Sequence, residues 1–318
     1  MNSRRSGRGA PFGPDLRGVR DAIARALGEH VPDGVRTGEL DRGGRALRWV
    51  EAGRGGVVPV VLIAGAGSSS LTWVPVLPEL AEYGRVVAYD RAGLGASEPG
   101  HTATPTLDGQ IADLTALVEH LDAGPVLLVG HSWGGQLAQL LTWLRPELVA
   151  GLVLVDPAHE EFQPRSIRVA ESVLNRIWLY RAARAAQASK EPQPTEPTVW
   201  PVEPLGRAEA AEVAHRHQRR TILAEQRMTA SVVREVRRSR SAARPPEVPL
   251  VVLSATDGLP RGMRSRWTAM QAAVADGAVR GTHRLVRGAG HAIQADRPQA
   301  VTEAVGDCVD QVRSCLEN

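Results

Sequence analysis

A serine in a constrained turn is the feature of this sequence that most clearly indicates chemistry. An apolar run that begins at Val126 ends in a Gly-x-Ser-x-Gly motif centred on Ser132, and Gln136–Trp143 has the apolar spacing of an amphipathic helix. A strand, a sharp turn and a helix are the context that a nucleophilic serine in this motif requires. Gly130 and Gly134 fit this interpretation because so tight a turn leaves no room for Cβ atoms beside the serine. The pattern predicts a serine hydroxyl presented for attack on a carbonyl carbon.

Backbone N–H groups suited to the same chemistry are predicted nearby, because an attacked carbonyl oxygen develops negative charge. The Trp133 N–H lies at the start of the predicted helix, where an anion is favoured. Residues 57–63 form a wholly apolar stretch that runs into a turn rich in Gly and Ser, whose N–H groups can face an anion. A dinucleotide-binding turn is the alternative. It is disfavoured because Gly65-x-Gly67-x-x-Ser70 lacks the third glycine and no acid follows the next strand in the relation that a ribose requires.

Strands and helices must alternate along the chain to hold these groups in place. A helix with Trp73 and Leu80 on its inner side follows the Gly-rich turn. Apolar and alternating patterns predict strands at residues 35–40, 45–51, 57–63, 85–89, 126–129, 149–155, 249–253 and 283–286, and further helices at 15–28, 106–121, 263–274 and 298–316. The predicted fold class is α/β, with a mostly parallel central sheet of about eight strands flanked by helices and connected by right-handed crossovers.

Four motifs in order give the chain a family resemblance. An apolar strand with a Gly-rich turn is followed by Asp90-x-x-Gly-x-Gly-x-Ser97, then by Gly-x-Ser-x-Gly-Gly around Ser132, and finally by Gly-x-Gly-His ending at His291. This series resembles the α/β-hydrolase fold superfamily and extends over about residues 57–291. The resemblance implies a cofactor-independent serine hydrolase that acts on an ester, lactone or related carbonyl substrate. It also implies that the turn from Asp90 to Ser97 is structural.

The resemblance implies a catalytic triad in the order serine, acid, histidine. Ser132 is the expected nucleophile, and His291 is the expected base because it lies in a Gly-flanked loop after the last strand. Asp257, which follows the strand that begins at residue 249, is the expected acid. Asp156, at the end of the preceding strand, is the alternative. His131 is expected to point away from the serine and pack beneath the turn.

The resemblance also assigns an oxyanion hole to the backbone N–H groups of Ala66 and Trp133, with Gly65 in the substrate-binding turn. Many relatives have His-Gly where this chain has Ala64-Gly65. Because the donors are backbone groups, the hole is compatible with this change. We expect the change to affect the contacts that hold this loop in position, and therefore which acyl group the site accepts.

A helical insertion is expected late in the sheet, in the position of the family's lid. The resulting organisation is a tail at residues 1–14, a hydrolase core at 15–156 and 247–318, and a lid at 157–246, with helices expected at 167–185 and 207–238. Trp178, together with Ile177, Leu179 and Tyr180, is a candidate for the substrate pocket, and packing within the lid is the equal alternative. The many lid arginines favour a solvated helix face over a funnel for anionic substrates.

Composition and charge limit the classes of partner that we expect this protein to bind. The formal net charge is +3 and the pI about 9.3, but the basic residues are nearly all Arg and are mixed with 35 acids, so we expect no nucleic-acid partner. No apolar run approaches the ~20 residues needed to span a bilayer, and residues 1–14 lack the apolar segment of a secretion signal. The sequence therefore predicts a cytoplasmic protein that acts on a small-molecule substrate.

The cysteines and histidines indicate no further site. Cys308 and Cys315 are seven residues apart in a predicted helix, about 10 Å along its axis, which is too far for a disulfide. They are expected to be thiols in a reducing compartment. His215 and His217 point in different directions on a helix, so no metal site is expected.

Other functions remain open on the same fold. These are acyl transfer, thioester release, carbon-carbon bond hydrolysis, cofactor-free oxidative chemistry and noncatalytic ligand binding. Epoxide hydrolases and haloalkane dehalogenases of this fold have a carboxylate where Ser132 stands, so their chemistry is disfavoured. The sequence leaves the natural substrate and the oligomeric state undetermined.

Overall fold

The core of the protein is one eight-stranded sheet that connects β1 through β8 in the order β1-β2-β4-β3-β5-β6-β7-β8. The computed structural model describes residues 15–102, 104–162, 173, 176–177, 179–181, 184, 202–244 and 246–317. The strands are β1 (Arg36–Asp41), β2 (Ala46–Gly56), β3 (Val60–Ile63), β4 (Gly84–Asp90), β5 (Val126–His131), β6 (Val149–Val155), β7 (Pro249–Ala255) and β8 (Arg280–Val286). The pairs β1–β2 and β2–β4 are antiparallel and the other pairs are parallel. The predicted fold class is confirmed.

The central strands are the most apolar because helices cover both of their faces. Every residue of β3, β5 and β7 is buried, whereas the edge strand β1 alternates between half-buried and exposed residues. Successive side chains of a strand point to opposite faces, so the sheet supports two separate hydrophobic clusters.

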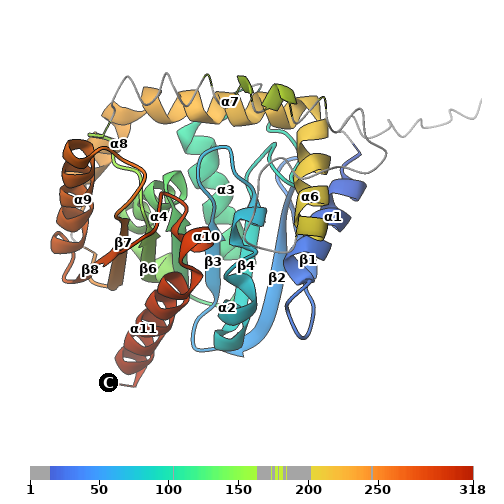
Figure 1. Ribbon diagram of the computed structural model, residues 1–318. Coiled ribbons are helices and arrows are strands. Elements are labelled where there is room, and N and C mark those ends of the chain that lie inside the picture. Colours follow the sequence, from blue (N-terminus) through green and yellow to red (C-terminus); the bar gives the residue numbers. More distant parts are fainter. Residues whose placement is uncertain are drawn as a thin grey trace, which may run out of the picture.

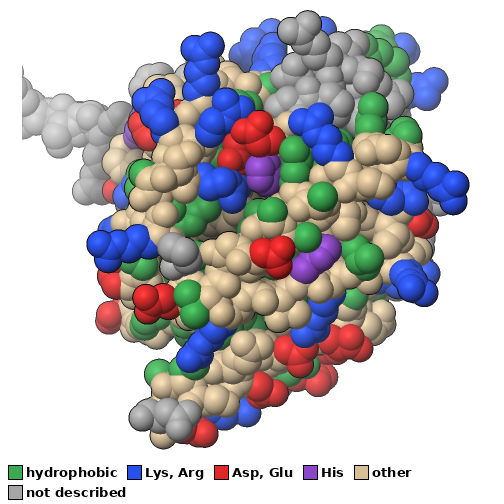
Figure 2. All heavy atoms as spheres, turned by 90° about the vertical axis from the view of Figure 1, so that its left-hand side faces the viewer, with side chains coloured by type: hydrophobic (Ala, Val, Ile, Leu, Met, Phe, Trp, Pro, Cys, Tyr) green, Lys and Arg blue, Asp and Glu red, His purple; other side chains and the backbone are tan. Residues whose placement is uncertain are grey.

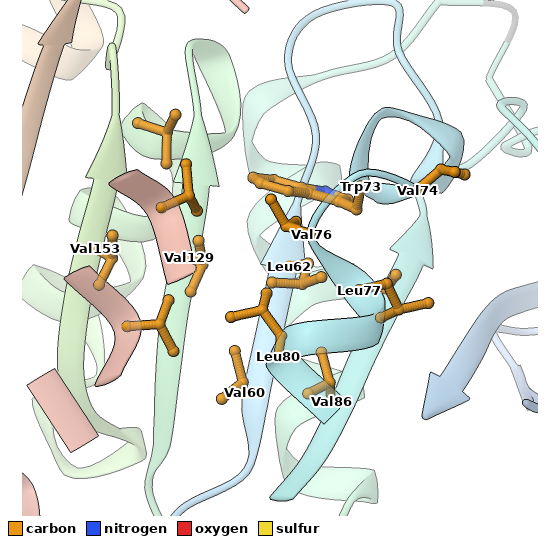
Figure 3. Packing of buried hydrophobic residues seen from close by; sticks show 14 of the residues in the cluster. Val60, Leu62, Trp73, Val74, Val76, Leu77, Leu80, Val86, Val129 and Val153 are labelled. Carbon is orange, nitrogen blue, oxygen red and sulfur yellow. The ribbon is translucent and has the colours of Figure 1, made fainter. Parts of the chain in front are cut away.

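Helices cover the first face of the sheet at several points (Figure 1). They are α1 (Arg17–Gly28), η1 (Ser70–Trp73), α2 (Leu77–Tyr83), α10 (Ile293–Asp296) and α11 (Pro298–Leu316). Figure 3 shows how Trp73, Leu77 and Leu80 pack over Leu62 and its neighbours in β3 and β4. The predicted inner side of this helical segment is thus confirmed. Packing of this kind fixes the end of the Gly-rich turn, because η1 begins directly after the turn.

The second face carries α3 (Leu107–His120), α4 (Trp133–Leu144), η2 (Pro146–Leu148) and α9 (Arg261–Asp276). Leu137 and Leu141 of α4 pack with Leu128 of β5 in the second hydrophobic cluster. Thr106 caps α3 by accepting a hydrogen bond from the Gly109 N–H at 3.1 Å. The helix that starts at Trp133 therefore rests on the strand that ends just before it.

In residues 202–244 of the insertion between β6 and β7, the structure describes three helices, namely α6 (Val202–Ala214), α7 (Arg216–Ser231) and α8 (Val233–Ala242). The prediction of a single helix at 207–238 is wrong. The helix is interrupted at His215, whose backbone is extended, and again at Val232. The breaks let each helix bury a different face: α6 packs beside α1, and α7 crosses the carboxyl ends of the strands (Figure 1). The helix predicted at 167–185 and the predicted tail lie largely or wholly outside the described residues.

The surface carries mixed charge. Figure 2 shows Lys and Arg side chains dispersed over the face that includes α8 and α9, with acidic side chains among them. Both cysteines are free thiols, with Cys308 buried and Cys315 exposed. Among the described helices, none combines the length and the apolar character needed to cross a membrane.

Candidate active site

Ser132 occupies a strained turn at the carboxyl end of β5. Its backbone has φ 50° and ψ −116°, a region that side-chain-bearing residues rarely adopt, and it directly precedes α4. A Cβ atom on Gly134 would lie 2.0 Å from the Ile63 carbonyl oxygen, and one on Gly130 would lie 2.5 Å from the Gly134 oxygen. Both contacts are impossible, so the predicted steric role of the two glycines is confirmed. The Ser132 residue is half-buried.

His291 lies beside this serine although 159 residues separate them in the sequence. Its Nε2 is 3.0 Å from the Ser132 Oγ, and its Nδ1 is 2.6 Å from Oδ2 of Asp156. The imidazole side chain is 54% exposed, whereas the Asp156 side chain is 3% exposed. A buried carboxylate that accepts from Nδ1–H fixes the tautomer in which Nε2 is the nitrogen that accepts the serine proton.

Asp156 is held by donors on every side. Its Oδ1 accepts hydrogen bonds from the Ala255 N–H at 3.1 Å, from the Trp267 indole N–H at 2.8 Å and from the Gln271 side-chain amide at 3.0 Å. Burial alone would raise the pKa of this carboxyl, but the hydrogen bond and charge of His291, with those other donors, hold the pKa below its ordinary value. Asp156 is therefore an ionised partner for the imidazole.

The expectation that Asp257 pairs with the histidine is wrong. Asp257 lies in an exposed turn, where its carboxylate accepts from the Thr256 hydroxyl at 3.1 Å and its N–H donates to the Ala289 oxygen at 2.9 Å. The physical reason is the order of the strands. Asp156 comes directly after β6, which pairs directly with β5, whereas Asp257 comes two residues after the end of β7, one strand further away. The alternative acid, Asp156, is the one that contacts His291.

The Gly-rich turn after β3 lies against the serine. A Cβ atom on Gly65 would be 2.9 Å from Nδ1 of His131 and 3.4 Å from Cβ of Ser132, so this position requires glycine. Among the described hydrogen bonds, none uses the Ala66 N–H as donor. Trp133 is the first residue of α4, and an N–H in that position has no acceptor within its helix. The two predicted oxyanion donors thus belong to segments that meet beside Ser132.

His131 supports the loop that carries the base. Its Nε2 donates to the His291 carbonyl oxygen at 2.9 Å, and the two rings lie 4.8 Å apart between centroids. Burial, with the neighbouring His291, lowers the pKa of His131 to about 3, so its ring is neutral. As expected, this histidine is a packing residue beneath the turn.

Hydrogen bonds connect the turn from Asp90 to Ser97 with the neighbouring loop at Ser70 and stabilise the turn itself. Asp90 accepts from the Ser70 N–H at 2.7 Å and from the Ala96 N–H at 2.8 Å, and the Ser97 hydroxyl donates to the Asp90 oxygen at 2.6 Å. These contacts are structural, in agreement with the family resemblance.

Trp178, the predicted pocket residue, lies outside the described residues. Its neighbour Leu179 is buried against Val213, with Ile222 and Leu223 beside them, whereas Ile177 and Tyr180 are exposed. Leu179 therefore packs within the insertion. In the part of the chain that the structure describes, no group of three His, Cys, Asp or Glu side chains is placed to hold a metal ion.

Sequence reasoning missed several polar residues that support the site. Trp267 and Gln271 lie four apart on α9, so their N–H groups reach the same carboxylate. Arg91 and Glu225 form a buried ion pair beside the Gly-rich turn. The one available signal for Glu225 was an acid between apolar residues in an Arg-rich helix, at Ile222, Leu223, Ala224 and Met228.

Comparison with known proteins gives the family. The profile of the alpha/beta hydrolase family matches residues 60–304. One curated relative is the dihydrolipoyllysine-residue acetyltransferase component of the acetoin cleaving system of Pseudomonas putida, 39% identical over 116 residues, or 36% of this chain and 31% of the relative. Another is epoxide hydrolase 4 of Mus musculus, 32% identical over 117 residues, or 36% of this chain and 33% of the relative. The chain thus matches about a third of the length of these relatives.

Solved structures agree on the architecture. Haloalkane dehalogenase DbeA from Bradyrhizobium elkani USDA94 superposes with a TM-score of 0.69 and 19% identity, and the match covers 88% of this chain and 99% of the dehalogenase. A likeness at this identity concerns the fold. Because the family profile extends over most of the sequence, including the serine turn, Asp156 and His291, the chain belongs to the alpha/beta hydrolase family.

Proposed function

We propose that this protein is a serine hydrolase that cleaves an ester, lactone or related carbonyl substrate through a Ser132–His291–Asp156 triad. One observation carries the proposal: the Ser132 Oγ lies 3.0 Å from Nε2 of His291, whose Nδ1 lies 2.6 Å from Asp156. These distances are within hydrogen-bond reach for nucleophile, base and acid together.

The first half of the reaction makes an acyl-enzyme. Nε2 of His291 takes the proton from Ser132 as Oγ attacks the carbonyl carbon, and the Asp156 carboxylate stabilises the imidazolium. The oxygen of the tetrahedral intermediate accepts from the Ala66 and Trp133 N–H groups. His291 then gives its proton to the leaving oxygen as the carbon–oxygen bond breaks.

Water completes the cycle. His291 takes a proton from a water molecule that attacks the acyl carbon, and the same N–H groups stabilise the second intermediate. The serine recovers its proton when the acid product leaves. The reaction balances with substrate and water alone, so we propose that it needs no cofactor or metal.

The identity of the nucleophile separates this proposal from the activities named for some relatives. Attack by a serine on the saturated carbon of an epoxide or a haloalkane would form an ether, which water cannot readily cleave. Attack on a carbonyl forms an ester, which water can hydrolyse. Ser132 therefore supports acyl chemistry over the epoxide hydrolase and haloalkane dehalogenase activities.

We further propose that the insertion between β6 and β7 acts as a lid over a small-molecule site. The closeness of α7 to the site loops supports this, since a Cβ atom on Gly67 would lie 2.9 Å from Ile222 and one on Gly93 would lie 2.6 Å from Thr221. A lid in this position excludes water from the intermediates and limits the size of the acyl group.

Labelling with a fluorophosphonate tests the assignment directly. We expect wild-type protein to form a covalent adduct, located at Ser132 by mass spectrometry, and Ser132→Ala to form none. Equal labelling of Ser132→Ala would contradict the proposal.

A substrate panel then resolves the reaction type. p-Nitrophenyl esters, thioesters and lactones of matched acyl chain are compared by kcat/KM, with and without an added alcohol as acyl acceptor. Turnover to free acid supports hydrolysis, and product formed on the acceptor supports acyl transfer. Binding without turnover that is insensitive to Ser132→Ala would favour a noncatalytic ligand-binding protein.

A further inference from the structure

A carboxylate from the insertion reaches into the core beside the oxyanion loop. Glu225 lies on α7 and is 1% exposed, and it pairs with Arg91, which follows β4 and is 2% exposed. Neither residue belongs to the triad. A buried ion pair is costly to desolvate, and hydrogen bonds to both partners must offset that cost.

Four N–H donors converge on the two oxygens of Glu225. Oε1 accepts from Nε of Arg91 at 2.7 Å and from the Gln110 side-chain amide. Oε2 accepts from Nη2 of Arg91 at 2.7 Å and from the Gly67 backbone N–H. Because each oxygen faces two donors, a carboxylate satisfies this site, whereas the amide of a glutamine would turn N–H groups against two of them.

Arg91 fixes the other polar groups of the same loop. Its Nη1 donates to the Ala64 oxygen at 2.7 Å, and its Nη2 donates to the Gly65 oxygen at 2.6 Å. The Gly65 carbonyl and the Ala66 N–H belong to one planar, trans peptide group, so they point in opposite directions. The bond from Arg91 to Gly65 therefore directs the Ala66 N–H away from the guanidinium.

The cluster also reaches the second segment of the oxyanion hole. Gln110, which donates to Glu225, accepts from the Trp133 indole N–H at 2.8 Å. One carboxylate on α7 is thus tied directly to the loop after β3 and, through Gln110, to the first residue of α4. Both backbone donors proposed for the oxyanion lie in these two segments.

We propose that Glu225 is a positioning residue that completes the oxyanion hole only when α7 is seated on the core. If α7 separates from the core, the Gly67 N–H and the Arg91 guanidinium lose the Glu225 carboxylate as their acceptor. Arg91 then no longer fixes the Gly65 carbonyl, and the Ala66 N–H is no longer held in one orientation. Docking of the insertion and stabilisation of the oxyanion are therefore coupled. This inference rests on the proposed serine hydrolase function.

The test compares two buried carboxylates that fasten the same insertion. Glu160 accepts from Nε and Nη2 of Arg240 on α8, at 2.6 and 3.0 Å, and from the Gln136 amide at 3.1 Å. Among the described hydrogen bonds, none connects Glu160 with residues 64–68. Glu160→Gln is therefore a matched control for Glu225→Gln, because it weakens the seat of the insertion at a distance from the loop.

We expect Glu225→Gln to lower kcat about 10- to 100-fold with KM changed less than about threefold, since loss of one oxyanion donor typically costs about 10²- to 10³-fold and misalignment costs less. Affinity for a trifluoromethyl ketone, whose adduct with Ser132 carries an oxyanion, is expected to fall by the same factor. Arg91→Lys is expected to behave alike, because a single ammonium cannot bridge Glu225 and the Gly65 oxygen. Glu160→Gln is expected to keep both kcat and ketone affinity within about threefold.

Hydrogen exchange gives a readout that is independent of turnover. In Glu225→Gln, the amides of residues 64–68 are expected to exchange at least about tenfold faster, with no such change in Glu160→Gln. Unchanged ketone affinity and loop exchange in a folded Glu225→Gln, or an equal loss in Glu160→Gln, would overturn the inference. Failure of the wild-type protein to react with fluorophosphonate would instead overturn the proposed function, and the exchange result would still decide whether Glu225 orders the loop.

Discussion

Replacement of Asp156 by asparagine is the sharpest test of the proposed triad. The carboxylate accepts four hydrogen bonds, one from His291 on Oδ2 and three from Ala255, Trp267 and Gln271 on Oδ1. An asparagine amide turned toward the histidine forces the proton onto Nε2, which then cannot accept the serine proton. The same amide turned the other way faces three donors.

The expected loss follows from the tautomer. An imidazole held with its proton on Nε2 is inactive as a base, and the equivalent change in another serine enzyme lowers kcat about 10⁴-fold. A loss of that size corresponds to about 5.5 kcal/mol of transition-state stabilisation. We therefore expect kcat/KM of Asp156→Asn toward a p-nitrophenyl ester to fall about 10³- to 10⁴-fold.

Asp257→Asn is the matched control for this experiment. Asp257 is exposed and contacts Thr256, so its replacement is expected to leave kcat/KM within about twofold of wild type. Thermal melts establish that both variants are folded. A folded Asp156→Asn that keeps more than a tenth of the activity would refute the assignment, as would an equal loss in Asp257→Asn.

Three further predictions concern the support of the site. Gly134→Ala places a Cβ atom 2.0 Å from the Ile63 oxygen, so denaturant unfolding should show a loss of at least about 2 kcal/mol; wild-type stability would contradict the packing argument. Burial lowers the pKa of His131 to about 3, whereas a histidine in the unfolded chain has a pKa of about 6.5, so below pH 6.5 the unfolded chain binds this proton more readily than the folded protein does. As the pH is lowered from 6 to 3, the free energy of unfolding should therefore fall by up to about 1.4 kcal/mol per pH unit, and His131→Phe should reduce that slope. Trp267→Phe removes one donor to Asp156 and should lower kcat about three- to tenfold, whereas an unchanged kcat in ester turnover would show that this donor is dispensable.

The sheet and the serine turn were predictable because their signals are local. The strand at 149–155 has the predicted bounds, and the helix at 298–316 begins and ends where the pattern indicates. Wholly apolar runs report burial on both faces of a sheet, and the glycines around Ser132 report a turn too tight for side chains. Each of these features depends on residues within one short segment.

The acid and the loop anchors were not predictable in the same way. Asp156 and Asp257 each follow an apolar strand, and the choice between them depends on strand order and on donors from Ala255, Trp267 and Gln271. These donors lie about 100 residues or more from Asp156 in the sequence. The division of 207–238 into three helices likewise follows from packing, since its helical periodicity shows no break.

The position of the acid has a consequence for the rigidity of the site. Ser132 and Asp156 both follow strands that pair directly, and both have positive φ, at 50° and 42°. The Ser132 N–H donates to the Val155 oxygen at 3.1 Å, and the Ser132 oxygen accepts from the Ala158 N–H at 2.9 Å. The sheet therefore sets the distance between nucleophile and acid.

The base is the one triad member carried by a loop. The hydrogen bonds that restrain that loop include those from Nε2 of His131 to the His291 oxygen, from the Gly290 N–H to Asp296 at 2.7 Å and from the Asp257 N–H to the Ala289 oxygen at 2.9 Å. With the nucleophile and the acid fixed by adjacent strands, the imidazole needs to move only a short way between the serine, the leaving group and the attacking water. An acid at Asp257 would instead place both the acid and the base on loops, and the alignment of the triad would then depend on the conformations of two loops.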